Sequence, residues 1–210
     1  MTETVPPALK ARKRPVQRRS GVTVDAILEA TLQVLLREGM KRLTTTRVAA
    51  RAGVSVGTMY QYFPNKQALV YALNARYLDT LAERIEATCT VQRGVPMAQM
   101  VDALIDTYWA AKTERADVTR ALYRSVTELD NDALVHAFAQ RVDTATHAML
   151  ASACDLPPVD VRAINLALSS VIYGTVRNAF ERGLPDAEAE ALRDSLGAMC
   201  RAYLQTLASW

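Results

Sequence analysis

The residues between Thr44 and Phe63 combine small, hydroxyl-bearing and amide side chains at helical spacing. Gly57 and Thr58 are small enough to let a helix backbone approach another molecule closely, and Gln61 can pair with adenine through two hydrogen bonds. These residue types predict contacts with base edges in a DNA major groove. The side chains expected to face outward for this purpose are Val56, Gly57, Thr58, Gln61 and Tyr62.

Two short helices joined by a tight turn would hold these side chains. Thr44 can cap a helix over residues 45–52, and Ser55 can cap another over residues 56–62, because a hydroxyl oxygen accepts from free amides at a helix start. Gly53 between them supplies the positive φ that such a turn requires. The side chains expected to pack inward are Val48, Ala49, Ala52, Val54, Met59 and Phe63. This pattern predicts a helix-turn-helix, whose second helix enters the major groove.

Phosphate contacts are predicted from charge and from hydrogen-bond donors near the same helices. Thr45, Tyr60 and Lys66 carry hydroxyl or ammonium donors that suit phosphate oxygens. The free amides where helices begin at Thr45 and Lys66 add partial positive charge. Residues 1–70 hold 12 Lys and Arg against 4 Asp and Glu, a net charge of +8, whereas residues 71–210 carry −5. A basic front on an acidic remainder predicts that the front binds a polyanion such as nucleic acid.

Residues 1–20 form a basic, proline-containing segment without helical periodicity. Its composition predicts a disordered arm. Two interpretations remain open for it. The arm either lies along DNA phosphates or in a minor groove, or it only keeps the protein soluble.

The rest of the chain shows helical periodicity interrupted by glycine and proline, and no alternating strand pattern of useful length, so the predicted fold class is all-α. Thr23 is the expected cap of the first helix, and Gly39 its expected left-handed end. This first helix is expected over residues 24–38, and the helices after the helix-turn-helix over residues 66–89, 97–113, 117–127, 132–153, 159–182 and 187–208.

Residues 22–73 resemble the N-terminal signature of the TetR family of bacterial helix-turn-helix regulators. The resemblance rests on the stretch LTTTRVAARAGVSVGTMYQYFPNKQAL and on the preceding helix that ends in Glu38–Gly39. The family features present are the threonine cap, Ala49–Ala50, Gly53–Val54, Tyr60, Phe63, Lys66 and Leu69. The resemblance implies duplex DNA contacts at Thr45, Thr46, Val56, Gly57, Thr58, Tyr60, Tyr62 and Lys66.

The resemblance also implies a larger helical domain for effector binding and dimerisation after the DNA-binding helices. The expected organisation is therefore a basic arm over residues 1–20, a helix-turn-helix domain over 21–68 and a helical effector-binding and dimerisation domain over 69–210.

Two apolar stripes near the C-terminus predict a homodimer. They recur at helical spacing on the last two expected helices, and two such helices from each partner could form a four-helix interface about a two-fold axis. The alternative is that the stripes face only their own chain's core. The expected interface residues are Ile164, Leu168, Val171, Ile172, Thr175, Leu196, Met199 and Tyr203.

A small-molecule effector pocket is predicted from aromatic and polar side chains in the helical domain. For each of these residues ordinary packing is the competing interpretation. Two histidines among them lie about three helical turns apart but have no further metal ligands nearby, so we expect no metal and no cofactor. The candidate lining residues are Tyr108, Trp109, Tyr123, His136, Phe138, His147, Met149 and Asn178.

Several classes of protein are disfavoured by what the sequence lacks. It contains no phosphate-binding glycine loop, no nucleophile elbow and no clustered His and Cys, so we expect no enzyme. The scattered Cys89, Cys154 and Cys200 suggest buried free thiols, with a redox sensor as the alternative. No stretch is apolar enough for a membrane span and no signal peptide is evident, so we expect a cytoplasmic protein.

The function expected from these features is a transcriptional repressor that an unidentified small-molecule effector releases from a palindromic double-stranded DNA operator. The alternative is an architectural or protein-interaction factor that uses the same fold on DNA. Activation instead of repression stays open, as do the operator sequence and the effector.

Overall fold

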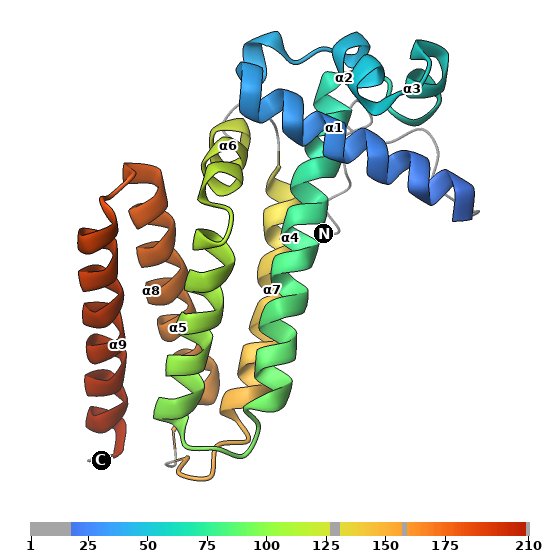
Figure 1. The fold of residues 1–210 in the computed structure, drawn as a ribbon. Helices are drawn as coiled ribbons and strands as arrows, with labels where there is room; N and C mark the ends of the chain where they lie inside the picture. The colour runs from blue at the N-terminus through green and yellow to red at the C-terminus, as the bar shows by residue number, and fades with distance from the viewer. Residues whose placement is uncertain (1–17, 127–130, 157–158, 209–210) are drawn as a thin grey trace. The chain divides into compact units, whose positions relative to one another are not determined.

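The computed structural model describes residues 18–126, 131–156 and 159–208, and these ranges form helices joined by turns, without a strand (Figure 1). The predicted all-α class is confirmed. The helices are α1 (Arg18–Arg42), α2 (Thr45–Ala52), α3 (Val56–Tyr62), α4 (Lys66–Val91), α5 (Met97–Thr113), α6 (Ala116–Val126), α7 (Asp132–Leu150), α8 (Val161–Arg182) and α9 (Asp186–Ala208).

The two short helices begin and end where local capping signals predict. The Thr44 hydroxyl accepts a hydrogen bond from the Arg47 amide, and the Ser55 hydroxyl accepts one from the Thr58 amide at 3.0 Å. Gly53 ends α2 with φ 69° and ψ 27°, and its amide donates to carbonyls of the last turn. A side chain at this φ would be strained, which explains why the turn uses glycine.

The start of α1 differs from the prediction. The helix begins at Arg18, so Thr23 lies inside it rather than capping it, and residues 18–20 belong to a helix rather than to the arm. The remainder of the predicted arm, residues 1–17, lies outside the described residues. Gly39 has φ 74° and interrupts α1 where its end was expected, although a short helical stretch continues to Arg42.

Two later helix ends depend on caps that the sequence analysis overlooked. The Asn65 side chain accepts a hydrogen bond from the Ala68 amide at 2.8 Å and caps α4. The Asp160 carboxylate accepts from the amides of Arg162 and Ala163, so α8 begins at Val161 rather than at residue 159. Helix α7 ends at Leu150, three residues before the predicted end.

The chain divides into two compact units, which are described separately. The first comprises Met1–Leu78 and Asp117–His136, and so combines the N-terminal helices with α6. Its apolar core draws on α1, α2, α3, the start of α4 and α6. The largest fully buried side chains of this core are Ile27, Leu43, Met59, Phe63 and Leu69.

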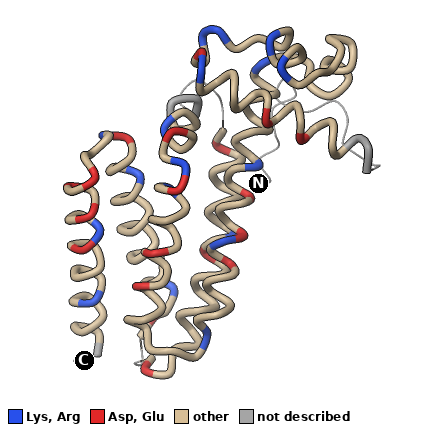
Figure 2. Tube along the Cα trace, in the orientation of Figure 1, with Lys and Arg blue, Asp and Glu red and all other residues tan. Residues whose placement is uncertain are grey.

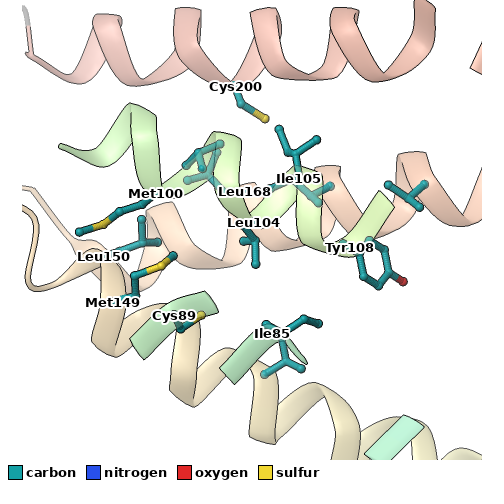
Figure 3. Close-up of a cluster of buried hydrophobic side chains, with 14 of the residues drawn as sticks. Ile85, Cys89, Met100, Leu104, Ile105, Tyr108, Met149, Leu150, Leu168 and Cys200 are labelled. Carbon is teal, nitrogen blue, oxygen red and sulfur yellow. The ribbon is translucent and has the colours of Figure 1, made fainter. Parts of the chain in front are cut away.

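The second unit comprises Asp79–Ala116 and Ala137–Trp210. Figure 3 shows Leu104, Ile105 and Tyr108 of α5 in the middle of its apolar core, with Cys200 of α9 on one side and Ile85 of α4 on the other. Helix α5 therefore packs against several neighbours at once. Among the described helices of the chain, none is both long and apolar enough to cross a membrane.

Ion pairs between helices flank this second core. The Arg141 guanidinium on α7 donates two hydrogen bonds to the Glu86 carboxylate on α4, at 2.5 and 2.7 Å, and this pairing lowers the pKa of Glu86. On α9, Arg193 and Arg201 pair with Asp106 and Asp102 of α5 at 2.5 and 2.6 Å. Because solvent screens these largely exposed pairs, each contributes little to the free energy of unfolding.

Candidate nucleic-acid interface

Helix α3 is amphipathic, and its inner face holds it in the first unit. Met59 and Phe63 are buried, as predicted from their four-residue spacing. On the opposite side Val56 is 41% exposed and Tyr60 43% exposed, and Gln61 is exposed as well. The buried side fixes the rotation of the helix about its axis, and the exposed side is thereby available to a ligand.

One outward-facing prediction on this helix is wrong. Tyr62 is only 7% exposed and belongs to the core of the first unit. It lies three residues after Met59 and therefore on the same side of the helix. The sequence analysis assigned only Met59 and Phe63 to the inner face of α3, and Tyr62 belongs to that face as well.

Gly57 lies on the exposed face, near the N-terminus of α3. A methyl group added at this position would meet only the Ser55 hydroxyl oxygen, at 3.7 Å. The backbone of α3 is therefore open to close approach here. Thr58 beside it is partly buried, and its hydroxyl lies 2.8 Å from the Ser55 hydroxyl in a hydrogen bond.

The Thr45 hydroxyl connects the two helices by a hydrogen bond to the Tyr60 hydroxyl at 3.2 Å. Thr45 itself is buried, unlike Tyr60. This hydrogen bond orients the phenol hydroxyl of Tyr60. Thr46, the next residue of α2, is exposed, and Lys66 at the start of α4 is partly exposed.

Positive charge is concentrated around these helices. From Arg37 to Lys66 the chain holds six basic residues and one acidic residue, a net charge of +5. Figure 2 shows the basic positions along the end of α1 and on α2. Arg42 is exposed, whereas Arg47 pairs with Glu38. This charge supplies the sequence-independent attraction to phosphates on which nucleic-acid binding largely depends.

A shallow hollow of about 290 Å³ lies between α1 and α2. The Arg51 guanidinium contributes to its wall and donates to the Gln33 side chain at 2.7 Å. The sequence analysis did not identify this hollow, although the four-residue spacing of Arg47 and Arg51 on α2 was a signal for a shared face. Its lining residues are Gln33, Val34, Arg37, Glu38, Arg47, Ala50 and Arg51.

The residues predicted for a dimer interface separate into two groups. Four of them lie in the second unit's own core at 3% exposure or less, so placing them at an interface was wrong; these are Ile164, Leu168, Ile172 and Leu196. Val171, Met199 and Tyr203 are exposed, and Thr175 is partly exposed. Leu166, which the sequence analysis missed, is 63% exposed, as is Met199. Half of the predicted interface residues are therefore core residues, and the others form an exposed or partly exposed margin beside them.

The predicted effector-pocket residues do not form one cluster. Those that belong to the core of the second unit are Tyr108, Trp109, Phe138 and Met149. Tyr123 belongs to the first unit, where it is partly exposed, and three of the predicted residues, His136, His147 and Asn178, are exposed, which contradicts their prediction as pocket lining. Helical spacing alone did not distinguish the solvent side from the core side.

A buried lysine that the sequence analysis missed lies in the second unit. Lys112 is 2% exposed, and its ammonium lies 5.2 Å from the centre of the Tyr108 ring. Burial, together with the positive charge of Arg177, lowers the pKa of Lys112 to about 7. Arg177 itself is exposed and pairs with Glu181 at 2.6 Å. Four-residue spacing of Lys112 from Tyr108 on an apolar helix face was the available signal.

The cysteines divide between core and surface. Cys89 and Cys200 are buried thiols, as predicted, and burial raises the pKa of Cys89 to about 11. A raised pKa disfavours the thiolate that oxidation requires. Cys154 is exposed, which contradicts the expectation of burial for this residue.

Family models match both parts of the chain. The model described as bacterial regulatory proteins, tetR family, matches residues 27–73, and the model of a tetracyclin repressor-like C-terminal domain matches residues 96–204. Together with the helix-turn-helix geometry, these matches define a helical DNA-binding transcriptional regulator. The chain belongs to the tetR family of bacterial regulatory proteins.

Comparison with individual proteins adds relatives of two kinds. The nucleoid occlusion factor SlmA of Haemophilus ducreyi is 33% identical over 135 residues, which cover 64% of this chain and 62% of that protein. The chain thus matches somewhat less than two thirds of the length of this relative. A putative tetR-family transcriptional regulator from Mesorhizobium loti has the same fold, with a TM-score of 0.69 at 18% identity over 90% of this chain and 98% of that one. A TetR-family regulator from Streptomyces coelicolor gives a TM-score of 0.59 at 25% identity, over 88% and 99%.

The low pKa of Lys112 predicts that stability depends on pH. Between about pH 7 and the ordinary lysine pKa near 10.4, the folded state holds Lys112 neutral while the unfolded state holds it charged. The unfolded state then binds more protons, so the free energy of unfolding rises with pH, by at most about 1.4 kcal/mol per pH unit from this group. Lys112→Met should flatten the rise between pH 7 and 9 in urea denaturation.

The control for this measurement is Lys41→Met, which removes an exposed ammonium in the first unit. We expect the Lys41 variant to keep the pH dependence of the original protein. An equal slope in the Lys112 variant and the original protein would contradict the assignment.

Proposed function

We propose that this protein is a repressor that binds a two-fold DNA operator through α3 and is released by a small molecule. The observation that carries the proposal is the exposed face of α3, with Val56, Gly57 and Gln61 opposite the buried Met59 and Phe63. A helix with such a face fits a major groove, where its N-terminal residues contact base edges.

Three residues of α3 contact the bases in the proposed complex. Gly57 lets the helix backbone approach the bases, and Val56 contacts a thymine methyl group. Gln61 pairs with adenine through two hydrogen bonds. Because Val56 and Gly57 form no side-chain hydrogen bonds to bases, most of the discrimination falls to Gln61 and to the shape of the DNA.

Phosphate contacts position the helix in the groove. Tyr60, oriented by the Thr45 hydroxyl at 3.2 Å, donates to a phosphate oxygen. Thr46 and Lys66 donate beside it, from the first turns of α2 and α4. Such contacts carry no sequence information but set the register of the protein on the duplex.

A homodimer provides the two-fold symmetry of the proposed operator. The exposed apolar residues Leu166 and Val171 of α8 and Met199 and Tyr203 of α9 support an interface made by these two helices. A dimer places two recognition helices in successive major grooves, about 34 Å apart. Binding of an effector in the second unit would favour a state with a different spacing, and DNA affinity would fall.

A second function is favoured by the named relatives. SlmA is called a nucleoid occlusion factor. The same DNA-binding surface would then serve as a platform, and the bound protein would act through partners. This proposal needs no effector.

Operator binding is tested by fluorescence anisotropy with a duplex from the DNA that flanks the gene, and with a random duplex, over a salt series. We expect a preference for the flanking duplex of at least a hundredfold, about 2.7 kcal/mol. Gly57→Ala should lower the affinity for the flanking duplex at least tenfold, because the alanine methyl group would lie between α3 and the bases. Gly21→Ala, a helical glycine with equally open surroundings, is the control and should bind normally. Equal affinity of the original protein for both duplexes would contradict the proposal that the flanking DNA contains its operator.

The dimer is tested by light scattering of the Met199→Glu variant. Met199 is 63% exposed, so a glutamate there should leave the fold of one chain intact and oppose only the interface. We expect the original protein to have the mass of a dimer and the variant that of a monomer. Val91→Glu, a change at an exposed apolar residue of α4, should remain dimeric. If the Met199→Glu variant remains a dimer, α9 does not belong to the interface.

Genome-wide occupancy separates the two proposed functions. A repressor should occupy a few promoters, and its occupancy should fall when the effector is added to cells. A platform protein should occupy many sites outside promoters. Occupancy confined to one or two promoters would exclude the second function.

A further inference from the structure

Three side-chain oxygens on α8 are buried without a hydrogen-bond partner among the described residues. They are Asn165 Oδ1, Ser169 Oγ and Tyr173 Oη. Asn165 is 6% exposed and Ser169 is 5% exposed, while the hydroxyl of the less buried Tyr173 is itself shielded from solvent. Their four-residue spacing places them on one face of the helix.

Unpaired polar groups of this kind are rare in protein interiors. More than nine in ten buried polar groups form a hydrogen bond, because an unpaired one loses its bonds to water without replacement. Ser169 does not form even the bond to the preceding helical turn that the Thr146 hydroxyl forms on α7, at 3.0 Å to Val142. Three such oxygens on one face are therefore available to pair with a bound molecule.

The surroundings of this face are apolar and aromatic. The Tyr173 ring lies edge-on to Tyr108 of α5, with 4.7 Å between ring centres and 68° between planes. Figure 3 shows Tyr108 in the same core as Leu104 of α5 and Cys89 of α4. An aromatic ligand would therefore contact rings and apolar side chains along this face.

The hydrogen-bonding capacity of the three residues is mixed. Asn165 Nδ2 already donates to the Asp143 carbonyl on α7 at 3.4 Å, which leaves its Oδ1 as an acceptor. Burial, with Cys89 and Asp143 nearby, raises the pKa of Tyr173, so its hydroxyl stays protonated and can donate. Ser169 supplies a second hydroxyl donor.

We propose that this face of α8 binds a small, neutral aromatic amide. Ser169 and Tyr173 donate to the amide carbonyl, whose two lone pairs accept both bonds, and Asn165 Oδ1 accepts from the amide N–H. Side chains of a helix lean toward its N-terminus, which brings the long Tyr173 side chain back toward Ser169. One carboxamide group spans the roughly 5–6 Å between side chains four residues apart.

Only the consequence of binding rests on the proposed function: such a ligand would belong to the effector class that releases DNA. Binding itself is measured without DNA. If benzamide binds and no operator is found, only the repressor fails. If the operator is bound and benzamide is not, only the amide site fails.

The experiment is calorimetric titration of the full chain with benzamide, and with toluene as a ring that lacks the amide. We expect benzamide to bind at millimolar concentration or below, and toluene at least fivefold more weakly. Ser169→Ala and Tyr173→Phe each remove one hydroxyl and should weaken benzamide binding at least fivefold. Ser170→Ala changes an exposed serine on the same helix and should not alter it.

Thermal unfolding of the same variants without ligand guards against a merely structural role. Because the hydroxyls are unpaired, Ser169→Ala and Tyr173→Phe should leave the melting temperature unchanged or raise it. A lower melting temperature would mean that water pairs with these oxygens in the free protein. That result overturns the proposal, as do equal affinities for toluene and benzamide, or no binding of benzamide at all.

Discussion

The DNA-binding surface depends on the burial of Met59 and Phe63 beneath α3. Together with Tyr62, these side chains determine which face of a helix only seven residues long remains exposed. The positive φ of Gly53 sets the angle at which that helix leaves α2, and the hydrogen bond from Thr45 to Tyr60 connects the two again at the surface. A helix this short would not persist alone in water, so tertiary packing must maintain its orientation.

Helix ends could be predicted from the sequence around the turn between α2 and α3, where the caps were recognised, whereas the Asp160 cap of α8 was overlooked. Thr44, Gly53 and Ser55 specify the limits of α2 and α3 through local hydrogen bonds and one backbone conformation. Thr23 was misinterpreted because a threonine can also lie inside a helix, and the chain before it continues as helix from Arg18. A capping side chain thus predicts a helix end well where the chain before it is not helical. It predicts the end poorly where the preceding residues continue the helix.

The side of a helix that becomes buried was harder to predict, because it depends on neighbours distant in sequence. Ile172 and Leu196 have the spacing of an interface, yet they pack into their own unit. Lys112 escaped notice for the opposite reason, since a lysine is normally exposed and this one is 2% exposed. The helix-turn-helix residues were mostly predictable because α2 and α3 are adjacent in sequence. Residues of the second unit were not, because its core joins helices separated by many residues.

Polar groups in the two units differ in a way that bears on function. On the first unit, the hydroxyls of Thr45 and Tyr60 pair with each other, so this part of the surface is preorganised, and the basic residues around it attract phosphates. In the second unit, Ser169 and Tyr173 are buried and unpaired, an arrangement that destabilises the free protein and that a ligand would relieve. A ligand that pairs with both hydroxyls would bind more tightly to a conformation in which both can reach it. That differential affinity is the only means by which binding there can change the population of DNA-binding states.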